Sequence, residues 1–225
     1  MIQPLSFIHP EAQVAKNVIV DPFSTIDKNV VIGEGTWIGP NVTIMEGARI
    51  GKQCKIFPGA VISAVPQDLK FNGEDSLAII GNNTTIRECV TINRGTSING
   101  ETKIGNNCLI MAYSHIAHDC DIGDNVQLNP GCSIAGFVTI GDNSHVGMNA
   151  SVHQRSMIGK YCVIGAGSFF KGESPDGIVW GGVPSIPIKV NTIGIERSSL
   201  SESDKKLLLE VGEQFINSFK SSRNI

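Results

Sequence analysis

Charged side chains are scarce in this chain: they make up 17% of its 225 residues, against about 25% in a typical soluble domain. Aromatic residues account for only 6%, which argues against a large aromatic core. Leucine occurs 9 times against 30 isoleucines. Because β-branched residues favour strands, this imbalance argues against a helical bundle, and the composition as a whole argues against intrinsic disorder.

Several functional signals are also missing. No apolar run reaches the roughly 18 residues that a membrane span needs, and the first residues lack the charged and apolar regions of a secretory signal. No run of basic residues stands out against the formal net charge of −3, so nucleic-acid binding is not indicated. We therefore expect a cytoplasmic protein without a membrane span.

What the chain contains instead is a repeat of six residues. Counting in sixes from Ile8 to Phe170, 26 of 28 positions are apolar, and the two exceptions are Asp68 and Glu74. A small residue recurs four positions after most of these apolar residues, and glycine often follows them directly. One large inward side chain, a turn-permitting glycine and one small inward residue every six positions predict a short strand and a corner.

Three such hexads close a triangular coil of 18 residues. Residues 8–170 then predict about nine coils, which stack to about 40 Å at about 4.8 Å between strands. The pattern resembles the hexapeptide-repeat transferases, whose β-helices are left-handed, against the usual rule for crossovers, and which usually form homotrimers. We expect an all-β fold, a left-handed parallel β-helix over residues 1–187 with an extruded loop at 63–79, followed by a short helical region at 188–225. Within that region, Ser201 and Asp204 resemble a capping box ahead of an amphipathic helix.

The cysteines follow the same repeat. Five of the six occupy the small inward position, namely Cys54, Cys108, Cys120, Cys132 and Cys162. We interpret them as small core residues rather than as disulfide partners or metal ligands. Cys89 is off register.

His118 is the most informative polar residue. Because Ile116 and Cys120 should point inward, His118 is expected at an outward corner, where Asp119 could orient it as a general base. One coil further, Gly136 could offer a backbone N–H to an oxyanion, and two coils further Gln154 could bind a polar ligand.

The same arithmetic places three serines on the vertical line of His115, namely Ser97, Ser133 and Ser151. Together these residues predict a groove for acyl transfer to a hydroxyl or an amine. From the residues alone, His118 could equally be a surface histidine without a role. A zinc site could use His115 and His118 with a third ligand from a neighbouring subunit, but nothing fixes that ligand and we predict no metal.

Longer stretches resemble the acyl-[acyl-carrier-protein]–UDP-N-acetylglucosamine O-acyltransferases, the family that begins lipid A biosynthesis. They are residues 7–12, 66–70, 86–96, 115–120, 152–154 and 190–191. The Gln-Asp-Leu-Lys segment at 67–70 and the His-Ile-Ala-His-Asp segment at 115–119 are far more specific than hexads, which acetyltransferases and carbonic-anhydrase-like proteins also contain.

The resemblance implies a role for each matching residue. His118 would be the general base, Asp119 its partner and Gly136 the oxyanion donor in transfer of a (3-hydroxy)acyl chain to the sugar 3-hydroxyl. The substrate-binding residues would be Gln67, Asp68, Lys70, Asn93, His115, Gln154, Asn191 and Arg197. His153 and Ala166 would set the acyl-chain length, and alanine at 166 implies a shorter or repositioned chain. The implied partners are acyl-carrier protein, the nucleotide sugar and further copies of the chain, and no cofactor is expected because the thioester is already activated.

The chain departs from the family pattern at a few positions. Asn93 and Phe137 stand where histidine is usual, Ile193 replaces an acidic residue, and the helical tail is some 30 residues shorter. Two alternatives therefore remain beside the family reaction. One is a paralogous acyltransferase that uses another nucleotide sugar or acyl-CoA, and the other is a non-catalytic binding scaffold.

Overall fold

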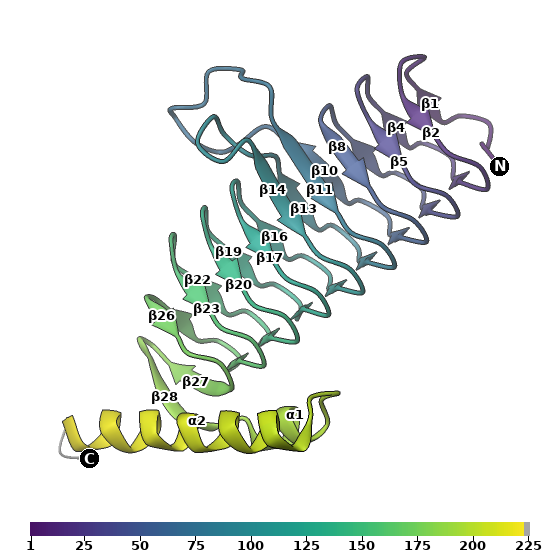
Figure 1. The fold of residues 1–225 in the computed structure, drawn as a ribbon. Coiled ribbons are helices and arrows are strands. Elements are labelled where there is room, and N and C mark those ends of the chain that lie inside the picture. The colour runs from purple at the N-terminus through teal and green to yellow at the C-terminus, as the bar shows by residue number, and fades with distance from the viewer. Residues whose placement is uncertain (223–225) are drawn as a thin grey trace.

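The computed structural model describes residues 1–222 and shows a triangular prism of short strands with a long helix across one end (Figure 1). Each side of the prism is a parallel sheet of nine strands, and the third side gains a tenth, antiparallel strand. We call the three sides face 1, face 2 and face 3, in the order in which the chain visits them. The left-handed parallel β-helix of about nine coils is confirmed.

Face 1 consists of β1 (Phe7–Ile8), β4 (Thr25–Ile26), β7 (Thr43–Ile44), β10 (Val61–Ala64), β13 (Thr91–Asn93), β16 (His115–Ile116), β19 (Ser133–Ile134), β22 (Ser151–Val152) and β25 (Phe169–Phe170). Face 2 consists of β2 (Gln13–Val14), β5 (Val31–Ile32), β8 (Ala48–Ile50), β11 (Leu77–Ile80), β14 (Glu101–Ile104), β17 (Asp121–Ile122), β20 (Thr139–Ile140), β23 (Met157–Ile158) and β26 (Glu173–Ser174). Face 3 consists of β3 (Ile19–Val20), β6 (Trp37–Ile38), β9 (Lys55–Ile56), β12 (Thr85–Ile86), β15 (Leu109–Ile110), β18 (Gln127–Leu128), β21 (His145–Val146), β24 (Val163–Ile164), β27 (Ile178–Gly182) and β28 (Ser185–Val190).

The core is a stack of aliphatic side chains inside the prism. In most strands the second residue is buried and the first faces outward. Coil stacks on coil in register, so that Ile92 pairs with Ile116 and Ile116 with Ile134. The five cysteines of the small inward position are free and buried, as expected. Their thiols donate to carbonyls one coil away, for example from Cys120 Sγ to Ala135 O at 3.1 Å.

The corners show why asparagine and glycine recur. The third residue after each inward aliphatic often has a left-handed backbone, such as Asn29 with φ of 52°, a conformation that asparagine tolerates better than most residues. The glycines directly after the inward aliphatics serve another purpose. A Cβ on Gly33 would lie 2.6 Å from the carbonyl carbon of Gly51. The expected turn role is therefore wrong for Gly33, which is needed for close stacking of coils.

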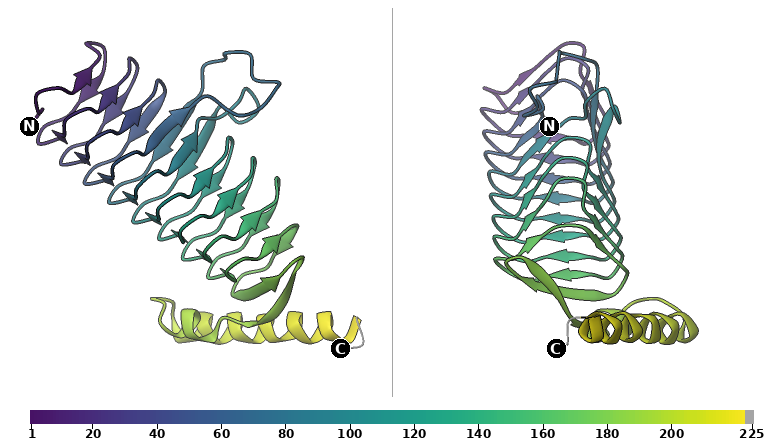
Figure 2. Two further views of the ribbon diagram at one scale, coloured as in Figure 1. Left: turned by 180° about the vertical axis from the view of Figure 1, so that it is seen from behind. Right: turned by 90° about the vertical axis from the view of Figure 1, so that its left-hand side faces the viewer.

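Two excursions leave the edge where face 1 meets face 2, which we call the 1–2 edge (Figure 1, Figure 2). The first is the expected loop, here residues 65–76 between β10 and β11, so both ends of the expected range 63–79 belong to strands. The second, Gly95–Gly100, was not expected and lies between β13 and β14.

The second excursion corrects three sequence-based expectations. Because it is one hexad long, it leaves the six-residue phase unchanged. Ile98, expected to point inward, is 65% exposed, and Thr102 occupies the small inward position expected for Thr96. The vertical neighbour of His115 is Thr91 rather than Ser97.

The C-terminal end is closed by helix. β28 runs antiparallel to β27 and ends at Val190, beyond the expected boundary at 187. Two helices follow, α1 (Thr192–Glu196) and α2 (Glu202–Ser222), and α2 packs on β28 across the end of the prism (Figure 2). Ser201 caps α2 as predicted, since its Oγ accepts the Asp204 N–H at 3.1 Å. In the described part of the chain, no helix is long and apolar enough to cross a membrane.

Candidate active site

The 1–2 edge carries a groove next to the loop. It has a volume of about 520 Å³ and is lined by Gln67, His115, Ala117, His118, Ser133, Ile134, Ala135, Gly136, Ser151, Val152, His153, Gln154 and Phe169. Most of these residues come from β16, β19 and β22 and from the corners that follow them. The groove thus brings together side chains from three successive coils, as the coil arithmetic predicted for His118, Gly136 and Gln154.

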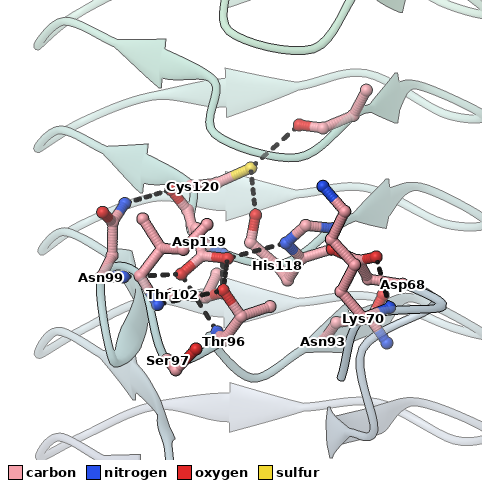
Figure 3. A network of polar contacts seen from close by, with 12 residues as sticks. Asp68, Lys70, Asn93, Thr96, Ser97, Asn99, Thr102, His118, Asp119 and Cys120 are labelled. Carbon is pink, nitrogen blue, oxygen red and sulfur yellow. Dashed lines mark hydrogen bonds and ion pairs between the residues drawn. The ribbon is translucent and has the colours of Figure 1, made fainter. Parts of the chain in front are cut away.

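His118 and Asp119 form a hydrogen-bonded pair at this edge (Figure 3). The Nδ1 atom of His118 lies 2.7 Å from Asp119 Oδ2, and the two side chains are 12% and 0% exposed. Because an ionised carboxylate can only accept, Nδ1 carries the proton and Nε2 is left with its lone pair. This is the tautomer that a general base needs.

Each oxygen of the Asp119 carboxylate accepts two hydrogen bonds. Its Oδ1 accepts the backbone N–H groups of Thr96 at 3.0 Å and Asn99 at 3.3 Å, and its Oδ2 accepts the Thr96 hydroxyl at 2.8 Å in addition to His118. The backbone N–H of Asp119 donates to Thr102 Oγ1 at 2.8 Å. Thr96 and Asn99 belong to the second excursion, and sequence reasoning missed their contact with the site because the hexad spacing concealed that excursion.

Gly136 lies against the His118 ring. A Cβ at this position would be 2.8 Å from His118 Cε1 and 2.9 Å from Nε2, so only glycine fits beside the imidazole. In the described part of the chain the Gly136 N–H donates to no protein acceptor. A free N–H beside a base is the arrangement that stabilises an oxyanion.

Phe137 also packs against the histidine. Its ring meets that of His118 edge to face, with centroids 5.3 Å apart, and the Arg155 guanidinium lies 4.3 Å from the Phe137 centroid. Phe137, which stands where a histidine is usual, therefore supports the His118 ring by van der Waals contact and cannot bond to a ligand through a ring nitrogen.

His115 is a neutral polar group on the groove floor. Its Nδ1 lies 2.8 Å from Thr91 Oγ1, and burial, followed by the nearby His118, lowers its pKa. Ser133 and Ser151 follow it on face 1, as the sequence predicted. His153 also lines the groove, with its ring edge to face with Phe169 at 6.0 Å.

The loop residues differ in their access to the groove. Gln67 lines it, whereas Asp68 and Lys70 do not, and Asp68 Oδ1 accepts the Lys70 backbone N–H at 2.9 Å. Asn93 is 2% exposed and donates from Nδ2 to Val65 O at 3.0 Å. In this structure Asn93 secures the start of the loop and does not reach the groove surface.

Other expected site residues lie elsewhere on the prism. Asn191 and Arg197 line a second pocket of about 570 Å³ over face 3, together with Ile193 and His145. Ala166 is exposed at the corner between faces 3 and 1 and does not line the groove. A single chain therefore does not bring these residues to His118.

His145 is a functional candidate that sequence reasoning left unassigned. It is the outward residue of β21 on face 3, and burial lowers its pKa. Within residues 1–222, no three histidine, cysteine or acidic side chains come together in a metal-binding cluster.

Comparison with known proteins identifies the family. Residues 29–64, 101–136 and 137–172 match the family model of the bacterial transferase hexapeptide (six repeats), and both excursions fall in the gap between the first two segments. The acyl-[acyl-carrier-protein]–UDP-N-acetylglucosamine O-acyltransferase of Janthinobacterium sp. (strain Marseille) is 42% identical over 89% of this chain and 77% of its own length. The Synechocystis relative is 40% identical, over 66% of this chain and 54% of its own length.

Solved structures of UDP-N-acetylglucosamine acyltransferases have the same fold as this chain. The UDP-N-acetylglucosamine acyltransferase of Francisella novicida superposes with a TM-score of 0.91 at 39% identity, over 94% of this chain and 78% of that one. The Bacteroides fragilis enzyme gives 0.83 at 43% identity, over 93% and 82%. The chain therefore belongs to the family of acyl-[acyl-carrier-protein]–UDP-N-acetylglucosamine O-acyltransferases.

Proposed function

We propose that this protein transfers a (3-hydroxy)acyl chain from acyl-carrier protein to the 3-hydroxyl of UDP-N-acetylglucosamine, the first step of lipid A biosynthesis. The observation that carries the proposal is the His118–Asp119 pair, which lies in the groove beside the unpaired N–H of Gly136. A base with a free ring nitrogen and a neighbouring donor for an oxyanion are the two groups that acyl transfer needs. The curated relatives and the solved structures named above support the same reaction.

The steps follow from the positions of these groups. His118 Nε2 takes the proton of the sugar 3-hydroxyl while its oxygen attacks the thioester carbonyl. The negative charge that develops on the carbonyl oxygen is stabilised by the Gly136 N–H. When the tetrahedral intermediate collapses, the C–S bond breaks, the imidazolium returns its proton to the leaving thiolate, and Asp119 stabilises the imidazolium between the two transfers. The thioester supplies the activation, and the scheme uses no cofactor.

Substrate binding requires residues from more than one chain. In the proposal, Gln67, His115 and Gln154 contact the sugar in the groove, with Asp68 and Lys70 closing over it from the loop. Asn191 and Arg197 bind the nucleotide from the tail of a neighbouring copy, since they lie over face 3 and the groove follows face 1. This arrangement supports a homotrimer in which Ala166 of the neighbour and His153 limit the acyl chain. We place the reaction in the cytoplasm, where acyl-carrier protein and nucleotide sugars occur.

Mass spectrometry of the product tests the reaction. Purified protein is mixed with UDP-N-acetylglucosamine and a panel of 3-hydroxyacyl and plain acyl-carrier proteins. A mono-acylated sugar nucleotide is expected, and His118→Ala should reduce its rate by at least ~10²-fold, the scale of a positioned general base. His9→Ala, which changes a half-buried histidine in the first coil, outside the groove, is the matched control. An unchanged rate in His118→Ala removes that residue from the mechanism.

A second acceptor is favoured by two specific observations. Phe137, whose ring contacts His118, offers no ring nitrogen to a ligand, and Ile193 places an alkyl group in the face 3 pocket where an acidic residue is usual. Either change alters how a nucleotide sugar is held without removing the base. If no donor acylates UDP-N-acetylglucosamine but another nucleotide sugar or acyl-CoA gives product, the paralogous reaction replaces the first proposal. Binding without turnover from any donor would indicate a non-catalytic scaffold.

A further inference from the structure

The excursion Gly95–Gly100 is not required by the β-helix. Its two ends touch, because a Cβ on Gly95 would lie 2.3 Å from the backbone nitrogen of Glu101. Joining Arg94 directly to Glu101 would leave a regular hexad from Ile92 to Ile104 with Thr102, already buried, at its small inward position. Because the β-helix would keep its six-residue repeat without this segment, the presence of the segment is not explained by the fold.

The contacts of the excursion point to the catalytic pair. Ser97, Ile98 and Asn99 are exposed, whereas Thr96 is 4% exposed and faces Asp119. Thr96 bonds to both carboxylate oxygens, through its N–H to Oδ1 and through its hydroxyl to Oδ2. Two bonds from one residue fix the plane of the carboxylate as well as its position.

The excursion is itself secured by the neighbouring loop. The Ser97 N–H donates to Glu74 Oε1 at 3.0 Å, and the Asn72 N–H donates to Glu74 Oε2 at 2.8 Å. The same loop contributes Gln67 to the groove. Hydrogen bonds along the 1–2 edge therefore join the loop to the excursion through Glu74, and the excursion to the His118–Asp119 pair. Figure 3 shows the second of these two connections.

We propose that Thr96 is a positioning residue for the His118–Asp119 pair, and that the excursion Gly95–Gly100 exists to present it. The hydroxyl and N–H of Thr96 hold the Asp119 carboxylate so that Oδ2 faces His118 Nδ1 and keeps the imidazole in the tautomer with a free Nε2. Thr96 touches no reacting atom and acts through Asp119. The inference rests on the proposed function and deepens it.

Thr96→Val tests the role of the hydroxyl, because it preserves the shape and the backbone N–H. We expect kcat to fall by roughly 10- to 100-fold, the range that corresponds to one charge-assisted hydrogen bond, while KM changes less than about twofold because Thr96 does not line the groove. Thr96→Ser keeps the hydroxyl and should recover most of the rate. The Thr96 hydroxyl also accepts the Ile98 N–H at 3.3 Å. Thr84→Val is therefore the matched control, since Thr84 is fully buried and its hydroxyl likewise donates one hydrogen bond, to Gly105 O, and accepts one, from the Cys108 N–H, at a different edge.

The tautomer of His118, followed by ¹⁵N NMR on protein labelled at histidine, gives a readout independent of turnover. In the proposal the Thr96 hydroxyl holds Oδ2 toward His118 Nδ1. Without that hydroxyl the carboxylate is less well oriented, so the share of the tautomer with the proton on Nδ1 should fall. Thr84→Val should leave the tautomer unchanged.

The outcomes separate the two proposals. If folded Thr96→Val keeps both the kcat and the His118 tautomer of the unaltered protein, the positioning role is wrong. If Thr96→Ser fails to recover what Thr96→Val loses, the hydroxyl is not the cause and the role is again wrong. If the unaltered protein transfers no acyl group to any acceptor, the proposed function fails, while the His118 tautomer in Thr96→Val still decides whether Thr96 orders the pair.

Discussion

At the scale of single residues, burial holds two histidines in the neutral form. The pKa of His145 is lowered by burial alone, and that of His115 by burial and then by His118. Both side chains therefore resist protonation in the folded protein, whereas in the unfolded chain they would protonate near pH 6.5. Their neutrality links the stability of the fold to pH.

The sign of this linkage can be tested at His145. As pH falls below about 6.5, the unfolded chain binds protons that the folded chain does not, so the free energy of unfolding falls until the lowered folded pKa is passed. His145→Gln should therefore reduce the loss of thermal stability between pH 7.5 and pH 5.5. Thermal unfolding at one protein concentration measures it, with His9→Gln in the first coil as the control. An equal loss in the variant and the unaltered protein would contradict the prediction.

Much of the surroundings of the proposed His118–Asp119 pair could be predicted from the sequence at this scale. Between Ile116 and Phe170 each coil has 18 residues, so simple addition correctly joined His118 to Gly136 and Gln154. The same addition failed for Ser97, because six extra residues precede His115. The contact of Thr96 with Asp119 could not be predicted. The period placed Thr96 at a small inward position of the β-helix, whereas it lies in the excursion.

At the scale of elements, the six-residue period predicted the strands. It also predicted one of the two excursions but not the other. The loop 65–76 was visible because Asp68 and Glu74 cannot occupy inward positions. The excursion Gly95–Gly100 supplies Ile98 at the apolar position and Thr96 at the small one, so its sequence satisfies the period while its backbone leaves the wall. Counting in sixes detects an insertion only when it interrupts the repeat. An insertion of six residues that itself carries the repeat leaves no interruption.

Deleting Gly95–Gly100 tests whether the excursion serves the site rather than the fold. The deletion preserves the six-residue phase and places Thr102 in a regular hexad, so we expect a folded β-helix with unchanged circular dichroism. The Asp119 carboxylate would lose the three donors that the excursion supplies to it, and kcat should fall by at least ~10²-fold, because an unoriented base loses most of its advantage. A deletion that unfolds the protein would show that the excursion is structural, and one that keeps the activity would show that it is dispensable.

At the scale of the whole molecule, the prism separates the two groups of residues that the proposed reaction uses. The groove follows face 1 and the 1–2 edge, whereas the pocket with Asn191 and Arg197 lies over face 3 beside α1. In the proposal, a nucleotide sugar contacts both groups where face 1 of one copy meets face 3 of the next. Closed threefold symmetry would provide such a contact.

Mixed assemblies test this arrangement. His118→Ala should disable the groove, and Arg197→Ala should disable the tail pocket. If each site takes its groove from one chain and its tail from the next, then co-assembly of the two variants in equal amounts should restore about a quarter of the sites, since half the grooves and half the tails are intact. The acyl-transfer rate of the reassembled mixture measures this, and each variant reassembled alone is the control. A mixture no more active than its separate components would place both groups in one chain's site and would contradict the shared-site arrangement.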